Sequence, residues 1–267
     1  MIIDANVHVS ADGKWFHTPH DASLEKLIRE IESSAIDKAI VVPLPGVITN
    51  EQQRQLPAAG HPDLIHAYTF NPALFENPKA AAEGFKREFS HLKKSFIKFH
   101  NRFGKYHPED ERFMAVMKAN NEAAVPHVIG ICGLLHDRNT PSAISTEKYF
   151  FDLGKNFPET TLLIMHGGGT RILQIAELCR DLPNVFFDLS MTLTKYAETS
   201  VAADIRWLCK HYDRRMIWAS DFPEISPKIA LETFDDVCMN LEADKRKNIL
   251  GLNIACILNI PLNIPST

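Results

Sequence analysis

Two pairs of polar residues are spaced two positions apart, Asn6 with His8 and Lys98 with His100. Each pair ends a short apolar run, and residues two apart on a β-strand point to the same side. Amide, imidazole and amine groups that face one place can bind an anion, transfer a proton or ligate a metal ion. The spacing therefore predicts a polar site built from the ends of strands.

Two further segments carry residues of similar chemistry. His166 is followed by three glycines at 167–169, which keep the loop thin and let a ligand approach the backbone. Thr170 is then predicted to begin a helix whose free N–H groups hold a carboxylate or phosphate. Asp221 follows another apolar run. Each feature also has a structural interpretation: a hydrogen-bonded histidine, a tight glycine turn, or an aspartate that caps a turn.

The elements that position these residues follow from a regular alternation. Short apolar runs, often β-branched, predict strands at 2–9, 38–44, 65–71, 96–101, 126–132, 161–166, 185–190 and 216–220. Stretches of helical period lie between them at 23–34, 79–91, 110–123, 143–156, 170–181, 197–211 and 227–241. The segment 45–62 is predicted to hold a short extra helix or a loop over the site. Strands that alternate with helices indicate a parallel sheet.

Eight strands in 267 residues favour a closed α/β barrel of the (β/α)8 type, a single domain over 1–267. An open doubly wound sheet that binds a dinucleotide typically carries a G-x-G-x-x-G segment after its first strand, and the sequence has none. Such barrels gather functional residues where their strands end at one face. The strand ends carry a dense polar set in chain order: Asn6, His8, Asn71, Lys98, His100, Cys132, His166, Asp188, Ser190 and Asp221.

Composition excludes several classes of partner. The formal net charge is −4 and the 29 basic residues are scattered, which argues against nucleic-acid and membrane-surface binding. The five cysteines are widely spaced and form no C-x-x-C pair, as expected of a reduced protein. The apolar stretch 249–264 is interrupted by three asparagines and a proline, and no basic leader precedes the first strand. We expect a cytoplasmic protein with a small-molecule substrate; a homo-oligomer is left open.

Several segments resemble the amidohydrolase superfamily. Residues 3–8 resemble its opening Asp-x-His-x-His segment, 163–168 its sixth-strand segment, and 217–223 the Gly-Ser-Asp-x-Pro segment that ends its eighth strand. Residues 97–100 and 184–190 resemble its fourth and seventh strands, and the order along the chain matches. The most similar branch is the amidohydrolase-related (amidohydrolase 2) family of metal-dependent hydrolases, decarboxylases of unsaturated carboxylic acids, and lactonases. The resemblance implies a TIM barrel, often with one Zn²⁺ at its mouth.

The sequence departs from the metal-binding pattern of the family. The first metal-binding histidine of the family falls on Asn6, and the fifth-strand histidine falls on Gly130. His127, three residues before Gly130, has the opposite parity and is expected to face the helices. The usual ligands that remain are His8 and Asp221.

A metal site, if filled, is therefore predicted to use His8, Asp221, His166 and Asn6, with His100 as a further candidate. Zn²⁺ is the divalent metal expected there, and its occupancy is expected to be weak because an amide oxygen is a poorer zinc ligand than imidazole.

The resemblance implies a hydrolase that acts on a small carboxylate-bearing substrate with a lactone, amide or ester-like bond. Asp221 would take the proton of the attacking water, and His166 would polarise the substrate or transfer a proton. Lys98, His100 and Arg102 are the cations expected near an anionic substrate. Two alternatives remain: a decarboxylase of an unsaturated carboxylic acid, and a catalytically inactive barrel that acts as a binding protein.

Overall fold

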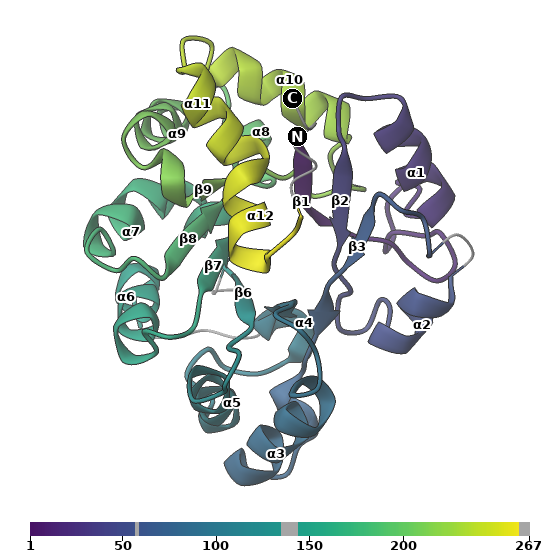
Figure 1. Ribbon diagram of the computed structural model, residues 1–267, viewed down its shortest axis with the longest axis vertical. Helices are drawn as coiled ribbons and strands as arrows, with labels where there is room; N and C mark the ends of the chain where they lie inside the picture. Colours follow the sequence, from purple (N-terminus) through teal and green to yellow (C-terminus); the bar gives the residue numbers. More distant parts are fainter. Residues whose placement is uncertain (57–58, 135–143, 262–267) are drawn as a thin grey trace.

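The computed structural model describes residues 1–56, 59–134 and 144–261 of the chain. Its strands form parallel ladders in sequence order and are ringed by helices (Figure 1). The strands are β1 (Ile3–Val7), β2 (Lys38–Val41), β3 (Leu64–His66), β4 (Tyr68–Thr69), β5 (Phe96–Phe99), β6 (Val128–Cys132), β7 (Leu162–Met165), β8 (Val185–Asp188) and β9 (Met216–Ile217). All eight predicted strands are present, with shorter bounds.

The eight strand positions close into a barrel. Only Ala67 separates β3 from β4, so the two segments form one strand that pairs with β2 on one side and β5 on the other. A parallel bridge between Val7 and Phe222 joins the end of the last strand to the first. The amide of His8 also donates to the Phe222 carbonyl at 2.7 Å. The predicted (β/α)8 TIM barrel is therefore confirmed.

Helices follow the strands on the outside of the barrel. The larger ones are α1 (Leu24–Glu32), α3 (Pro78–Phe89), α5 (Glu111–Asn121), α6 (Thr146–Asn156), α7 (Ile172–Leu178), α9 (Ser200–His211) and α10 (Pro227–Val237). The shorter ones are α2 (Asn50–Gln55), α4 (Asn101–Gly104), α8 (Thr192–Lys195), α11 (Ala243–Lys247) and α12 (Asn253–Leu258). All seven predicted helices are present, although residue 143, the predicted first residue of one, lies outside the described residues.

Helix starts follow capping chemistry. Ser23 caps α1 by accepting from the amide of Lys26, and Thr49 makes a capping box with Gln52 at the start of α2. The helix predicted within 45–62 is thus α2, and it takes the place of the outer helix between the second and third barrel strands. Within the described residues, no helix is both long and apolar enough to cross a membrane.

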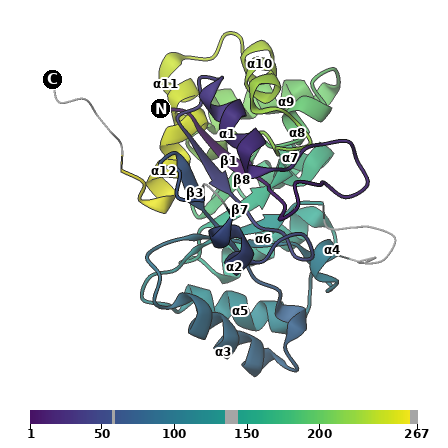
Figure 2. The same ribbon diagram turned by 90° about the vertical axis from the view of Figure 1, so that its right-hand side faces the viewer.

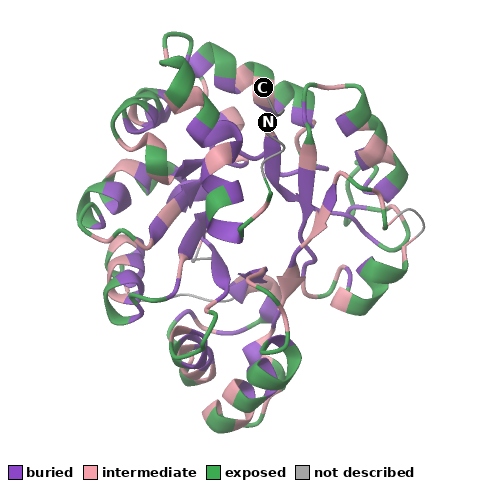
Figure 3. Cartoon of the chain, viewed as in Figure 1, coloured by how far each residue is buried: buried purple, intermediate pink, exposed green. Residues whose placement is uncertain are grey.

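The core has an inner and an outer part. Side chains such as Ile3, Ile40 and Leu163 fill the barrel interior, and the other strand faces pack against the helices. Buried residues accordingly concentrate on the strands (Figure 3). Ile254 and Ile257 of α12 pack on the interior cluster, so α12 closes one end of the barrel. Figure 2 shows α12 at one end and α4, which follows β5, at the other. The carboxyl ends of the strands therefore open at the end away from α12.

Candidate active site

A bulge in β1 turns two site residues inward. The register of β1 against β2 shifts between Asp4 and Val7. Ala5 belongs to the interior cluster, yet the side chain of the next residue, Asn6, also points inward. Two consecutive inward residues require such an irregularity in a strand. After it, Val7 packs outward and His8 points into the mouth.

Lys98 is the hub of the hydrogen-bond network at the mouth. It is 1% exposed, and its Nζ donates to Asn6 Oδ1 at 3.1 Å and lies 3.1 Å from His8 Nε2. The Nδ1 atom of His8 lies 2.6 Å from the carbonyl oxygen of Val42. Because a carbonyl only accepts, Nδ1 carries the proton and Nε2 presents a lone pair to Lys98. Burial and the charge of Lys98 lower the pKa of His8 to about 4, so this ring is neutral at neutral pH.

Asp221 supplies the negative charge of the site. Its Oδ1 accepts from Asn6 Nδ2 at 2.8 Å and lies 3.5 Å from His8 Nε2. Burial alone would raise the pKa of this carboxyl, but His166, His8 and Lys98 together hold it well below its usual value. Asp221 is therefore ionised at neutral pH.

His166 supplies a positive charge opposite Asp221. Its Nδ1 lies 3.1 Å from Ser190 Oγ, and its backbone N–H donates to Asp188 Oδ1 at 2.8 Å. Burial alone would lower its pKa, but Asp221 and Cys132 raise it to about 9. The imidazole is therefore protonated at neutral pH.

The two charged residues share an unusual backbone. His166 has φ 58° and Asp221 has φ 73°, in the left-handed region that non-glycine residues rarely adopt. Such residues concentrate at functional sites, where the surrounding structure holds them in place. The glycines at 167–169 continue the positive φ angles, which only glycine adopts without strain. The helix therefore begins at Ile172, and the prediction of an anion-binding helix start at Thr170 is wrong.

The remaining predicted cations lie beside this pair. His100 caps α4 through its Nδ1, which accepts from the amide of Phe103 at 3.3 Å, and its ring stacks on the Phe103 ring at 4.2 Å. Cys132, at the end of β6, interacts with both His100 and His166. Burial raises the pKa of its thiol, but these two histidines lower it well below the usual value. Arg102 carries a buried Nε with no hydrogen-bond partner among the described residues.

A cavity of about 80 Å³ collects these groups. His8, Lys98, His100, Arg102, His166 and Asp221 all line it, and Asn6 lies beneath Lys98. One wall is aromatic: the Trp15 ring stacks on His8 at 5.7 Å, and the Phe16 ring lies 5.4 Å from that of Phe103. The structure thus brings together every predicted site residue.

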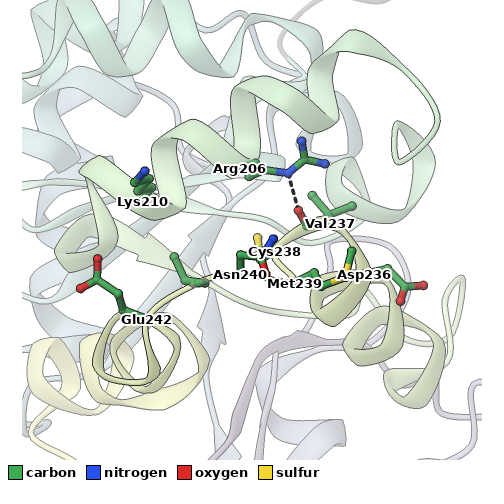
Figure 4. A pocket seen from close by; sticks show the side chains of 9 residues that line it. Arg206, Lys210, Asp236, Val237, Cys238, Met239, Asn240 and Glu242 are labelled. Carbon is green, nitrogen blue, oxygen red and sulfur yellow. Dashed lines mark hydrogen bonds between the residues drawn. The ribbon is translucent and has the colours of Figure 1, made fainter.

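A larger cavity of about 370 Å³ lies elsewhere, beside α9 and the segment that follows α10 (Figure 4). Its lining includes Arg206, whose Nε donates to the Val237 carbonyl at 2.7 Å, and none of the predicted site residues. Cavity volume therefore does not identify the candidate active site. The cluster of charged side chains at the barrel mouth identifies it.

Other polar residues at strand ends have structural roles. Asn71 caps a short 3-10 helix by accepting from the amide of Ala73 at 3.0 Å. His127 faces the helices, as predicted, where its Nε2 lies 3.2 Å from the carbonyl of Phe89. Trp15 and Phe16 were missed, because nothing in their loop sequence marks them as mouth residues. Cys132 was named among the polar residues at the strand ends, but no role was predicted for it.

The zinc ion that the resemblance implies does not fit the donors that the structure describes. Asn6 Oδ1 and His8 Nε2 already face Lys98 Nζ, and His166 is protonated. The ring of Phe96 fills the space beside Gly130, where an added Cβ would lie 2.3 Å from it. Over 1–56, 59–134 and 144–261, no three histidine, cysteine, aspartate or glutamate side chains are grouped to hold a metal. The described donors at the mouth therefore do not form a zinc site.

Comparisons with known proteins agree with this fold. An uncharacterised TIM-barrel protein from Bordetella bronchiseptica matches with a TM-score of 0.72 at 15% identity, over 97% of this chain and 99% of that one. A zinc-bound amidohydrolase from Burkholderia multivorans matches with a TM-score of 0.67 at 14% identity, over 98% and 100%. A probable 2-pyrone-4,6-dicarboxylic acid hydrolase from Acinetobacter baumannii matches with a TM-score of 0.62 at 13% identity, over 97% and 99%. Decarboxylases are also among the matching structures.

At these identities the solved structures show the fold alone. No curated protein gave a significant match. The family model of the amidohydrolases, however, matches residues 7–260, nearly the whole chain. The chain therefore belongs to the amidohydrolase family.

Proposed function

We propose that this chain is a hydrolase that cleaves a lactone, amide or ester-like bond in a small carboxylate-bearing molecule. The observation that carries the proposal is the charge arrangement of the mouth cavity. Ionised Asp221 and protonated His166 line the same space as Lys98, His100 and Arg102. An acid and a base with separated pKa values are what hydrolysis requires, and the additional positive charges of Lys98 and Arg102 suit an anionic substrate.

The reaction follows from these groups. Asp221 orients a water molecule and accepts its proton as the water oxygen bonds to the substrate carbonyl carbon. Because the pKa of Asp221 is low, this transfer is completed only as the new bond forms. Protonated His166 then donates its proton to the leaving oxygen or nitrogen as the bond from that atom to the carbonyl carbon breaks, and transfer of the proton held by Asp221 to His166 restores both groups. Lys98 and Arg102 bind the substrate carboxylate and so fix the carbonyl between the acid and the base.

A decarboxylase is the second candidate, and the protonated His166 favours it. Loss of carbon dioxide from an unsaturated acid leaves a carbanion that must be protonated at carbon. His166 carries an available proton and lines the cavity. In this reaction Asp221 would only hold His166 protonated, so the two candidates assign Asp221 different roles.

A substrate panel tests the proposal. Lactones and unsaturated dicarboxylates are offered with and without added Zn²⁺ or Mn²⁺, and both ring-opened product and released carbon dioxide are measured. We expect ring opening that is independent of added metal and that is lost in His166→Gln. Carbon dioxide release would select the second candidate. Binding of panel members without turnover would instead support a catalytically inactive barrel.

We also infer a cytoplasmic enzyme. All five cysteines are free thiols, as is usual in a reducing compartment. A fractionation experiment that recovers the protein outside the cytoplasm would contradict this inference.

A further inference from the structure

We propose that the ammonium group of Lys98 takes the place of the family's metal ion, so that the mouth carries a built-in cation and excludes a divalent metal. The inference rests on the proposed function only for the chemistry that this cation serves. Its central claim concerns occupancy of a site, and that claim can be tested without a substrate.

The first support is the position of Lys98 Nζ. The resemblance places metal ligands at residues 6 and 8 and at Asp221. Nζ lies 3.1 Å from Asn6 Oδ1 and 3.1 Å from His8 Nε2. Asp221 Oδ1 lies 3.5 Å from the same His8 nitrogen. The Lys98 amine thus sits among the atoms that would face a metal ion. Burial lowers its pKa, and the charge of Asp221 opposes that shift.

The second support is the orientation of His8. Its Nδ1 donates to the Val42 carbonyl at 2.6 Å, so Nε2 presents its lone pair to Lys98. A metal-bound histidine is oriented in the same way, with its second nitrogen donating to a carbonyl or carboxylate. Here an N–H of Lys98 takes the lone pair that a metal would otherwise take.

The third support is the residue that replaces the first histidine of the family. The side-chain amide of Asn6 accepts from Lys98 at its oxygen and donates from its nitrogen to Asp221 at 2.8 Å and to Ser190 Oγ at 3.2 Å. A neutral imidazole has a single N–H and could not donate to both Asp221 and Ser190 while it accepts from Lys98. Asn6 therefore suits a site centred on an ammonium group.

The fourth support lies on the fifth barrel strand. A side chain at Gly130 would meet the Phe96 ring at 2.3 Å and Met165 Sδ at 3.2 Å, measured from an added Cβ. The barrel interior is packed as if no ligand comes from this position. Asn6 and Gly130 thus both depart from the metal-binding pattern, in a way that agrees with a cation supplied by Lys98.

The ammonium group supplies part of what a metal would supply. After His166 and His8 it contributes to lowering the pKa of Asp221, and two of its three N–H groups hold Asn6 and His8. Since Lys98 lines the cavity, its third N–H can donate to a substrate oxygen. Unlike a metal, it cannot bind water as hydroxide, so deprotonation of water falls to Asp221.

Zinc binding by the protein and by matched variants tests this replacement. Each protein is stripped with a chelator, equilibrated with Zn²⁺, and measured for metal content and by isothermal titration calorimetry. We compare wild type, Asn6→His, Asn6→His/Lys98→Ala, and the matched control Asn6→His/Lys79→Ala. Lys79 is a surface lysine whose side chain is 85% exposed.

We expect zinc at the mouth only in Asn6→His/Lys98→Ala. That variant offers two histidines and Asp221 and lacks the competing ammonium. Losing an outer partner of a ligand alone costs about 10–100-fold in metal affinity, so gaining a ligand and removing the cation should raise affinity by at least about 100-fold. Equal zinc affinity in Asn6→His and Asn6→His/Lys98→Ala would overturn the proposal.

Zinc binding by the wild type, compared with His8→Ala, gives a second decision. Stoichiometric zinc in wild type that disappears in His8→Ala would overturn the proposal, whereas zinc that persists in His8→Ala lies elsewhere and agrees with it. If the double variant does not fold, ¹⁵N NMR of His8 in wild type decides. Unchanged Nδ1–H signals on addition of Zn²⁺ support the proposal, and a shift of Nε2 refutes it. A lack of hydrolytic turnover would affect the proposed function and leave these binding results intact.

Discussion

Replacing Asp221 by asparagine removes one charge while keeping the shape of the side chain. The new amide oxygen can still accept from Asn6 Nδ2, which is 2.8 Å from Oδ1 in the wild-type protein. The base that accepts the proton of water is lost, and general-base transfer is worth about 10²–10⁴-fold in rate. We therefore expect kcat/KM for hydrolysis to fall at least about 100-fold.

The same substitution has a stability cost that the structure lets us estimate. Asp221 is the strongest of the interactions that raise the pKa of His166 from 6.5 to about 9. At about 1.4 kcal/mol per pKa unit, the protonated ring stabilises the fold at pH 7 by about 2–3 kcal/mol. Losing most of this contribution should lower Tm by about 4–8 °C for a chain of this size. The low pKa of Asp221 reports this interaction together with those of His8 and Lys98, so the His166 contribution is counted only once.

The sign of the pH dependence provides an independent check. Because the folded pKa of His166 is raised, its contribution to stability is complete below pH 6.5 and is lost as the pH rises through about 9. The difference in the free energy of unfolding between wild type and Asp221→Asn should therefore shrink from pH 7 to above pH 9. Urea denaturation at both pH values measures it.

Asp181→Asn is the matched control, since this carboxylate is 92% exposed on the surface. It should change neither the rate nor the pH profile. Wild-type turnover in Asp221→Asn, or a stability difference that stays constant with pH, would refute the assignment of Asp221 as base and counter-ion.

Three further predictions test the surroundings of the site. Gly130→Ala should destabilise the fold by about 1–3 kcal/mol because the added Cβ would collide with the Phe96 ring, and Phe96→Leu in the same chain should restore part of the lost stability. Wild-type stability of Gly130→Ala in urea would contradict this close contact between residue 130 and Phe96. Burial raises the pKa of Asp4 to about 7, so the contribution of its protonated carboxyl to stability is complete below about pH 3.8 and is lost as the pH rises through 7. Asp4→Asn should therefore stabilise the fold by about 2–4 kcal/mol at pH 8 and by less at pH 5, as measured by urea denaturation. An equal effect at both pH values would be inconsistent with a raised pKa of Asp4. Cys132→Ser should lower the pKa of His166 below its wild-type value of about 9, as followed by NMR titration, and an unmoved titration would mean that the thiol does not act on the ring.

Much of the fold follows from local pattern. Short apolar runs such as 38–44 and 161–166 predicted buried strands, and capping residues such as Ser23 marked the helix starts. Thr170 was misjudged because the preceding glycines adopt positive φ and delay the helix to Ile172. Glycine allows positive φ angles but does not require them, so the sequence alone could not place the start of this helix.

The residues that form the site could be predicted from the sequence, but the contacts between them could not. Alternation along β1 places either Ala5 or Asn6 inward, and only the bulge allows both. The contact of Lys98 with His8 crosses the barrel mouth and depends on how the barrel closes. Charge states depend in turn on such contacts, and for this reason the opposite shifts of His8 and His166 could not be derived from spacing.

The closing contact of the barrel has a consequence for how the protein is made. The hydrogen bond between Asn6 and Asp221 joins residues 215 positions apart, and the bridge of Val7 to Phe222 lies beside it. A nascent chain without its last strand therefore has both an open seam and a buried lysine without its counter-ion. Since an uncompensated buried charge is strongly destabilising, partly made barrels should remain poorly ordered at the mouth. Assembly of the charged cluster and closure of the barrel would then form a single late event in folding.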